Sequence, residues 1–187
     1  MVWAMINLLE VEKNFLLPHI KKGGVAADFT MGNGHDTLWL SQAIGADGRL
    51  YAFDIQPQAL ENTRALLRSE GASENYTLIL DSHSNAEHYI TEKICAGMFN
   101  LGFLPGGDKT LTTKRETTLA AIRAAVSLLD DDGALLIAVY PGHEEGRIEG
   151  ELIEKELATY DRRQICASKF KIVNSPTSPF FFLVERK

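Results

Sequence analysis

A glycine turn and a downstream aspartate carry the first recognisable chemistry in this chain. Gly32-Asn33-Gly34 follows a short apolar run at 25–27, and a second apolar run comes a few residues later. This order is typical of a strand, a tight turn and a helix, and glycine lets the backbone pass close to a ligand. Asp54 stands about 20 residues further on, where a carboxylate can bind the two hydroxyls of a ribose. The pair indicates a site for a nucleoside cofactor.

The residues of this turn favour a cofactor without phosphate. A dinucleotide fingerprint has a third glycine where this chain has Thr37, and its pyrophosphate binds at the helix N-terminus. Asp36 would bring negative charge to that place, unless it is only a helix-start acid that the helix dipole stabilises. S-adenosylmethionine carries a sulfonium and an ammonium and no phosphate, so it suits an acidic loop. We expect its methionine part to be bound by the loop residues Gly32, Asn33, Gly34, Asp36 and Thr37.

Length and composition predict a single α/β domain that spans residues 1–187. Hydrophobic residues make up 45% and charged residues 24% of the chain, as in ordinary globular proteins. No apolar run approaches the roughly 20 residues of a membrane span. The first residues lack the basic start of a secretory signal, and no motif pairs Cys95 with Cys166. We therefore expect a cytoplasmic protein with reduced thiols and no membrane contact.

The charge balance limits which partners are expected. A net charge of −6 argues against a broad nucleic-acid surface, because phosphate contacts need clustered lysine and arginine. Lys109, Lys114 and Arg115 form one small basic group, which is either a local RNA contact or a solvated helix face. The five histidines come without a cysteine cluster or an H-x-x-x-H pair, so no metal site is expected.

The elements that must position these residues alternate along the chain. Alternating strands and helices predict a mostly parallel sheet with helices on both faces. The predicted strands cover 25–29, 49–54, 76–80, 96–101, 134–140, 163–170 and 180–186, and the predicted helices 8–22, 35–44, 57–70, 112–129 and 144–159. We expect Pro18 to kink or end the first helix, and a turn at 130–133. The last two strands follow each other directly, so they should be antiparallel to one another.

Seven strands with a final antiparallel pair resemble the class I methyltransferase fold, a Rossmann-like sheet with strand order 3-2-1-4-5-7-6. Ligands of open α/β sheets bind beyond the carboxyl ends of the strands. Gln56 follows the second predicted strand and can reach the ribose or the adenine. Ser82 and His83 follow the third, in the loop that lies along the adenine edge in the resembling fold. A surface histidine without a ligand is the alternative for His83.

The loop after the fourth predicted strand is the expected reaction side. Many amino-group methyltransferases carry Asn or Asp, two prolines and an aromatic residue there, and Asn100-Leu101-Gly102-Phe103 resembles that pattern without the prolines. The amide oxygen of Asn100 can accept a hydrogen bond from an amine and direct its lone pair at a methyl group. Either His143 or water is expected to accept the proton, and a plain loop histidine is the alternative. The expected substrate contacts are Gly102, Phe103, Pro105 and Lys109.

The motifs at 30–37, 53–56, 81–83, 100–109 and 140–143 together resemble one small bacterial family, labelled "putative rRNA methylase". It includes tRNA wobble-uridine enzymes that convert 5-aminomethyl-2-thiouridine into its 5-methylaminomethyl form. The resemblance implies an S-adenosylmethionine-dependent N-methyltransferase that acts on the anticodon region of tRNA. The family's cofactor residues carry over to Asn33, Asp36, Asp54, Gln56, Ser82 and His83.

Two other functions remain open from the sequence. The first is a methyltransferase that acts on rRNA or on a small-molecule amine, and the acidic balance favours the small molecule. The second is a nucleoside-binding module without catalysis. A chain of 187 residues has little room for a separate RNA-binding domain, so we expect a homodimer to share the substrate contacts. Trp3 and the phenylalanines at 180–182 are candidate dimer contacts, unless they belong to the core.

Overall fold

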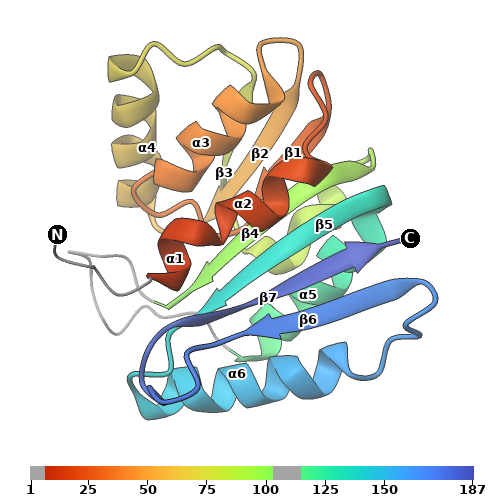
Figure 1. Cartoon of the computed structure of the whole chain (residues 1–187). Helices are drawn as coiled ribbons and strands as arrows, with labels where there is room; N and C mark the ends of the chain where they lie inside the picture. Colours follow the sequence, from red (N-terminus) through yellow and green to blue (C-terminus); the bar gives the residue numbers. More distant parts are fainter. Residues whose placement is uncertain (1–6, 103–114) are drawn as a thin grey trace, which may run out of the picture.

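One seven-stranded sheet organises the chain (Figure 1). The computed structural model describes residues 7–102 and 115–187, with side chains from 117 onward in the second part. The strand order is β3-β2-β1-β4-β5-β7-β6, which confirms the class I methyltransferase sheet. The strands are β1 (Val25–Asp28), β2 (Arg49–Asp54), β3 (Tyr76–Leu80), β4 (Ile94–Leu101), β5 (Leu129–Val139), β6 (Ile165–Phe170) and β7 (Phe180–Arg186).

The pairing brings the carboxyl ends of the first strands to one edge. β1 is parallel to both β2 and β4, with Ala26 opposite Leu50 on one side and Ala96 on the other. β3 and β5 continue the parallel part outward. β7 is antiparallel to β5 and to β6, so the expected reversal occurs at the last strand. The loops that follow the parallel strands therefore gather at the same edge of the sheet.

Helices cover both faces of the sheet, as expected (Figure 1). Successive residues of β1 pack on opposite sides: Ala26 lies in one core with Leu40, and Ala27 in the other with Ile122. Strands buried on both faces are nearly continuous apolar runs for this reason. The helices are α1 (Leu8–Val11), α2 (Lys13–Leu16), α3 (His35–Ile44), α4 (Pro57–Ser69), α5 (Arg115–Leu128) and α6 (Glu144–Leu157), with 3₁₀ turns η1 (Leu17–His19) and η2 (His83–His88).

The opening helix is shorter and more broken than the sequence predicts. Two short helices, α1 and α2, meet at Glu12, and the segment ends in the 3₁₀ turn η1, which contains Pro18. Proline removes one backbone donor and clashes with the preceding turn, so the helix does not continue to residue 22. Ile20 is already extended.

The predicted turn at 130–133 lies inside a strand rather than before it. β5 begins at Leu129, and its register with β4 shifts between Ile94 and Ala96. Asp132 takes a positive φ of 64°, which is the turn-like conformation expected there. An irregular stretch that keeps pairing on both sides is a bulge, so the strand starts earlier than its apolar run.

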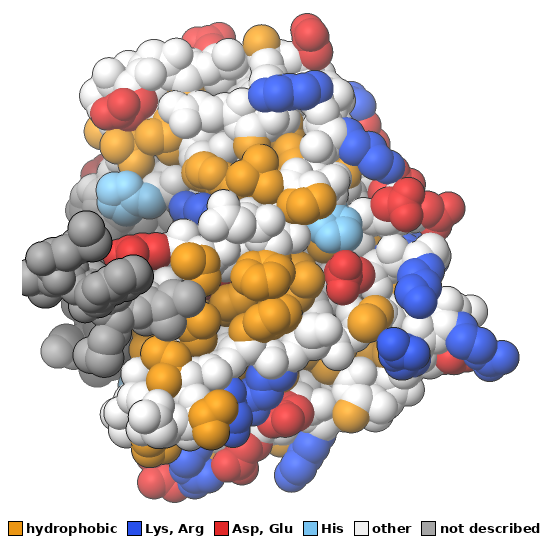
Figure 2. Space-filling view, viewed as in Figure 1, with side chains coloured by type: hydrophobic (Ala, Val, Ile, Leu, Met, Phe, Trp, Pro, Cys, Tyr) orange, Lys and Arg blue, Asp and Glu red, His pale blue; other side chains and the backbone are white. Residues whose placement is uncertain are grey.

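The three phenylalanines proposed as dimer contacts belong to the core. Phe180 is 9% exposed, Phe181 is fully buried and Phe182 is 3% exposed. Trp3 lies outside the described residues. Figure 2 shows another group of hydrophobic side chains in the middle of the face that Figure 1 presents, with charges of both signs around it. In the described parts of the chain, no helix is long and apolar enough to cross a bilayer.

Candidate active site

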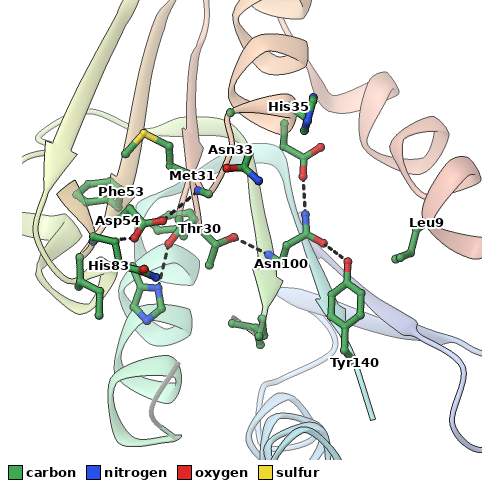
Figure 3. Close-up of a pocket in the computed structure, with 18 of the residues that line it drawn as sticks. Leu9, Thr30, Met31, Asn33, His35, Phe53, Asp54, His83, Asn100 and Tyr140 are labelled. Atoms are coloured by element: carbon green, nitrogen blue, oxygen red, sulfur yellow. Dashed lines mark hydrogen bonds between the residues drawn. The ribbon is translucent and has the colours of Figure 1, made fainter. Parts of the chain in front are cut away.

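A cavity of about 980 Å³ opens beyond the carboxyl ends of β1, β2, β3, β4 and β5. In Figure 3, labelled side chains from these strand ends and from α1 lie around one shared space. Eleven of the predicted site residues line it. They are Gly32, Asn33, Gly34, Asp36, Asp54, Gln56, Ser82, His83, Asn100, Gly102 and His143. The sequence motifs thus converge on one place, although they are spread over more than a hundred residues.

The remaining predictions fall elsewhere. Thr37 does not line the cavity, because it is buried and its hydroxyl donates to Asp28 Oδ2 at 2.6 Å. Phe103, Pro105 and Lys109 lie outside the described residues, as does Lys114 of the basic group. Arg115 begins α5 but its side chain is not described.

The glycine turn has the conformation that its sequence predicts. Gly32 and Gly34 have φ values of 54° and 87°, a region that favours glycine. A Cβ at Gly34 would lie only 2.8 Å from the Thr63 hydroxyl oxygen, so α4 packs directly against the turn. Beneath it, the buried carboxylate of Asp28 accepts from the Thr30 backbone N–H at 3.1 Å. Burial, together with the charge of Asp36, raises the pKa of Asp28 to about 7.

Asp54 connects the turn to the end of β2. Its carboxylate accepts from the Gly32 backbone N–H at 3.0 Å and from the Gln56 backbone N–H at 2.9 Å (Figure 3). A carboxylate has about four acceptor positions, so two remain for a ligand hydroxyl pair. Nearby, the ring Nδ1 of His83 lies 3.0 Å from the Phe29 carbonyl oxygen. Burial lowers the pKa of His83, which favours a neutral ring that donates through Nδ1.

Asn100 is held from three directions at the end of β4 (Figure 3). Its backbone N–H donates to Thr30 Oγ1 at 2.6 Å, and its side-chain amide donates to Asp36 Oδ2 at 2.5 Å. The Tyr140 hydroxyl donates to its Oδ1 at 3.1 Å. These contacts fix which end of the amide faces which neighbour. Because a carbonyl oxygen has two lone pairs, Oδ1 retains one for a further donor.

His143 caps a helix, which limits its chemistry. Its Nδ1 accepts from the Gly146 backbone N–H at 3.1 Å, at the start of α6. With Nδ1 acting as an acceptor, the ring carries its proton on Nε2. Accepting a proton at Nδ1 would remove the cap. This geometry favours a contact role for His143 over the proton-acceptor role.

Glu12 is a cavity residue that the sequence analysis missed. It stands where α1 meets α2 and is 3% exposed, and its Oε2 has no hydrogen-bond partner among the described residues. Burial and the charge of Asp36 raise its pKa to about 8, although the neighbouring Lys13 lowers it. Glu12 falls four residues after Leu8 and four before Leu16, both of which pack in one core. This helical spacing is the sequence signal that would have placed Glu12 on a buried face.

The charge of the cavity suits a cation. The described lining residues include four carboxyl groups but a single lysine, Lys13. Lys13 Nζ lies 2.5 Å from Asp36 Oδ1, so this lysine already neutralises one of the acids. The four acids are Glu12, Asp36, Asp54 and Asp81. A cationic donor that carries a ribose fits this acidic lining. The glycine turn also leaves space for such a ligand beside its backbone. Across the described side chains, no group of three His, Cys, Asp or Glu could hold a metal ion.

The strand order, the glycine turn and the cavity at the strand ends define the site of a class I methyltransferase. The chain matches the family model described as "Putative rRNA methylase" over residues 50–186. It therefore belongs to this family of S-adenosylmethionine-dependent methyltransferases, and the family resemblance drawn from its motifs is confirmed.

Curated and solved relatives agree with this membership. A chloroplastic tRNA (mnm⁵s²U34)-methyltransferase of Arabidopsis thaliana is 36% identical over 179 residues, and the match covers 90% of this chain and 65% of that protein. The chain thus spans just under two thirds of that relative's length. A structure described as a putative rRNA-methylase from Clostridium thermocellum is 32% identical with a TM-score of 0.94, covering 99% of this chain and 100% of that one. A putative methyltransferase from Streptococcus mutans, solved with S-adenosylhomocysteine, is 34% identical with a TM-score of 0.88, covering 98% and 100%.

Proposed function

We propose that this chain methylates the 5-aminomethyl group of 2-thiouridine at the wobble position of tRNA. The supporting observation is one cavity that Asn100 and Asp54 both line, at the carboxyl ends of β4 and β2. The name of the Arabidopsis relative, which specifies this uridine, supports the choice of substrate. The product is 5-methylaminomethyl-2-thiouridine.

In this proposal the residues of the cavity divide between two tasks. Asp54 and Gln56 hold the ribose, Ser82 and His83 contact the adenine, and Asn33 and Asp36 contact the methionine ammonium. When bound, S-adenosylmethionine supplies an electrophilic methyl group on a cationic sulfur. The Asn100 Oδ1 accepts a hydrogen bond from the substrate amine and directs its lone pair at that methyl group. Alignment provides most of the rate, because the leaving group is already a good one.

The test is a methyl-transfer assay with an isotope-labelled donor and two tRNA preparations. One carries 5-aminomethyl-2-thiouridine at the wobble position, and the other is the same tRNA without that modification. We expect label only in the first, and mass spectrometry of the nucleosides should show one added methyl group there. Transfer to rRNA or to small amines, but to neither tRNA, would replace this substrate with the alternative one.

A further inference from the structure

A buried acid at the edge of the cavity has no task in the scheme above. Glu12 lines the same space as Asn100 and Tyr140, and it is 3% exposed. Its Oε2 lies buried without a hydrogen-bond partner in the part of the chain that is described. Leaving a buried carboxyl oxygen unpaired destabilises the folded protein, because the oxygen has lost its hydrogen bonds to water and gained none in return. Such a group is an acceptor site that a ligand donor can fill.

The proposed reaction brings such a donor. An alkyl amine is an ammonium ion near neutral pH and has no lone pair to attack with, so one proton must leave before transfer. His143 is poorly suited to take it, because its Nδ1 already accepts from Gly146. Asp36 is also engaged, with Lys13 on one oxygen and the Asn100 amide on the other. Glu12 is the described cavity acid that retains an unpaired, buried oxygen.

We propose that Glu12 binds the ammonium form of the substrate amine and accepts its proton before methyl transfer. The inference rests on the proposed function, since it requires an amine substrate. An N–H bond breaks and its proton moves to Glu12 Oε2, leaving the electron pair on nitrogen. The nitrogen then bonds to the methyl carbon while the carbon–sulfur bond breaks and sulfur keeps that electron pair. The proton on Glu12 leaves to solvent with product release.

The surroundings of Glu12 adapt it to this task. Burial and Asp36 keep its pKa near 8 rather than 4.5, so its basicity is closer to that of an amine. A base whose pKa lies near the working pH accepts a proton with less uphill cost. The groups that act on it are Lys13 of α2, Asp36 of α3 and Tyr140 after β5. A cationic donor and an ammonium in the cavity both favour the ionised carboxylate when the complex forms.

The test compares E12Q with wild type and with the control E10Q. Glutamine keeps the shape of Glu12 but cannot take a proton, whereas Glu10 is an exposed acid on the same short helix. Each protein is assayed across pH on tRNA bearing 5-aminomethyl-2-thiouridine, and S-adenosylhomocysteine affinity is measured by calorimetry. For E12Q at neutral pH we expect kcat to fall about 100-fold, with cofactor affinity within about twofold of wild type. Its rate should then rise about tenfold per pH unit as solvent deprotonates the amine.

A second variant tests the same role by rescue. In E12A, added formate should restore part of the transfer at neutral pH, because a small carboxylate can occupy the vacated space, and E12Q should not respond. Wild-type kcat in E12Q, or a pH profile parallel to that of wild type, would overturn the assignment. Loss of S-adenosylhomocysteine binding in E12Q would also overturn it, in favour of a cofactor contact. If wild type itself transfers no methyl group to this tRNA, the proposed function fails instead, and the inference with it.

Discussion

The carboxylate of Asp54 fixes the backbone at two places in the cavity lining and is proposed to bind the ribose as well. Each of its oxygens accepts from a backbone N–H, one from Gly32 in the glycine turn and one from Gln56 at the start of α4. The same oxygens have lone pairs left for the two hydroxyls of a ribose. In the proposed function, Asp54 shapes the loop and binds the ribose with one group, and this would make an acid at the end of β2 informative in a sequence.

Replacing Asp54 by asparagine should weaken cofactor binding without unfolding the protein. An amide offers one acceptor oxygen instead of two and presents an N–H group to a backbone donor. Hydrogen bonds to a charged group contribute about 1.5–3 kcal/mol, so we expect S-adenosylhomocysteine affinity to fall roughly 10- to 100-fold in calorimetry. The control is Asp47→Asn, because Asp47 is an exposed aspartate just before the start of β2. Equal affinity in the two variants would contradict the assigned role.

Residues with a fixed place in a motif were predictable, and residues placed by tertiary packing were not. Asp54 and Asn100 stand at strand ends and Gly34 directly before α3, so their position follows from the alternation of elements. Thr37 follows Asp36 on the first turn of α3, and a rotation of about 100° per residue turns it inward to Asp28. Glu12 enters the cavity from an element that no motif marks. Its role depends on how the first helices lie against the sheet.

At the scale of elements, the contact between the glycine turn and α4 limits what the turn can carry. Gly34 caps α3 in a left-handed conformation, and Thr63 of α4 lies directly beside it. Thr63 also donates to the Gly32 carbonyl oxygen at 3.2 Å. The turn is therefore fixed between two helices, and its backbone can present a constant surface to a ligand.

The substitution Gly34→Ala separates backbone strain from this contact. A left-handed alanine costs about 1–2 kcal/mol, and the clash of its Cβ with Thr63 should add roughly 1–3 kcal/mol. Gly71→Ala is the matched control, because Gly71 also has a positive φ of 61° but no heavy atom within 4 Å of its Cβ position. Urea denaturation should show a larger loss of stability in G34A, and only G34A should lose cofactor affinity. Equal losses of stability in the two variants would mean that the close contact between Gly34 and Thr63 of α4 adds nothing to the cost of the substitution.

The arrangement of elements was predicted more reliably than their ends. The apolar run of β5 is long enough to identify a buried strand, the short run of β1 is identified by the glycine turn that follows it, and the direct link before β7 predicts its reversal. The start of β5 differs from the prediction because Asp130 and Gly133 are typical turn residues. In the structure, β4 pairs with β5 on both sides of them, at Leu129 and at Ala134. The break at Glu12 was not predicted, because each half of the opening segment is helical by itself and the two halves read as one helix in the sequence.

For the whole molecule, the net charge and the acid-rich cavity point to cationic ligands rather than to a broad RNA surface. The homodimer stays a prediction, now without the phenylalanines of β7. Phe15 is 37% exposed, and its ring centroid lies 4.6 Å from that of Phe170 in the same chain. Cys95 is buried and Cys166 is partly exposed, both without a disulfide.

Buried acids also make the stability of the whole molecule depend on pH. Glu12 ionises near 4.5 in an unfolded chain but near 8 in the folded protein. Between these values the folded state retains a proton that the unfolded state has released, so the free energy of unfolding falls as the pH rises. Asp28, with a pKa of about 7, contributes in the same direction up to about neutral pH. Cofactor-free protein should therefore be more stable in mild acid than in mild base.

The variant E12Q should remove part of this dependence. Glutamine has no proton to lose, so the cost of burying a carboxylate near Asp36 disappears at high pH while the shape of the side chain is kept. Between about pH 5 and about pH 8.5, we expect wild type to lose roughly 2–4 kcal/mol more unfolding free energy than E12Q in urea denaturation. The exposed-acid variant E10Q should follow wild type. If E12Q and wild type lost stability in parallel, Glu12 would be ionised in the folded protein throughout this range, and the tuned basicity assigned to it would be wrong.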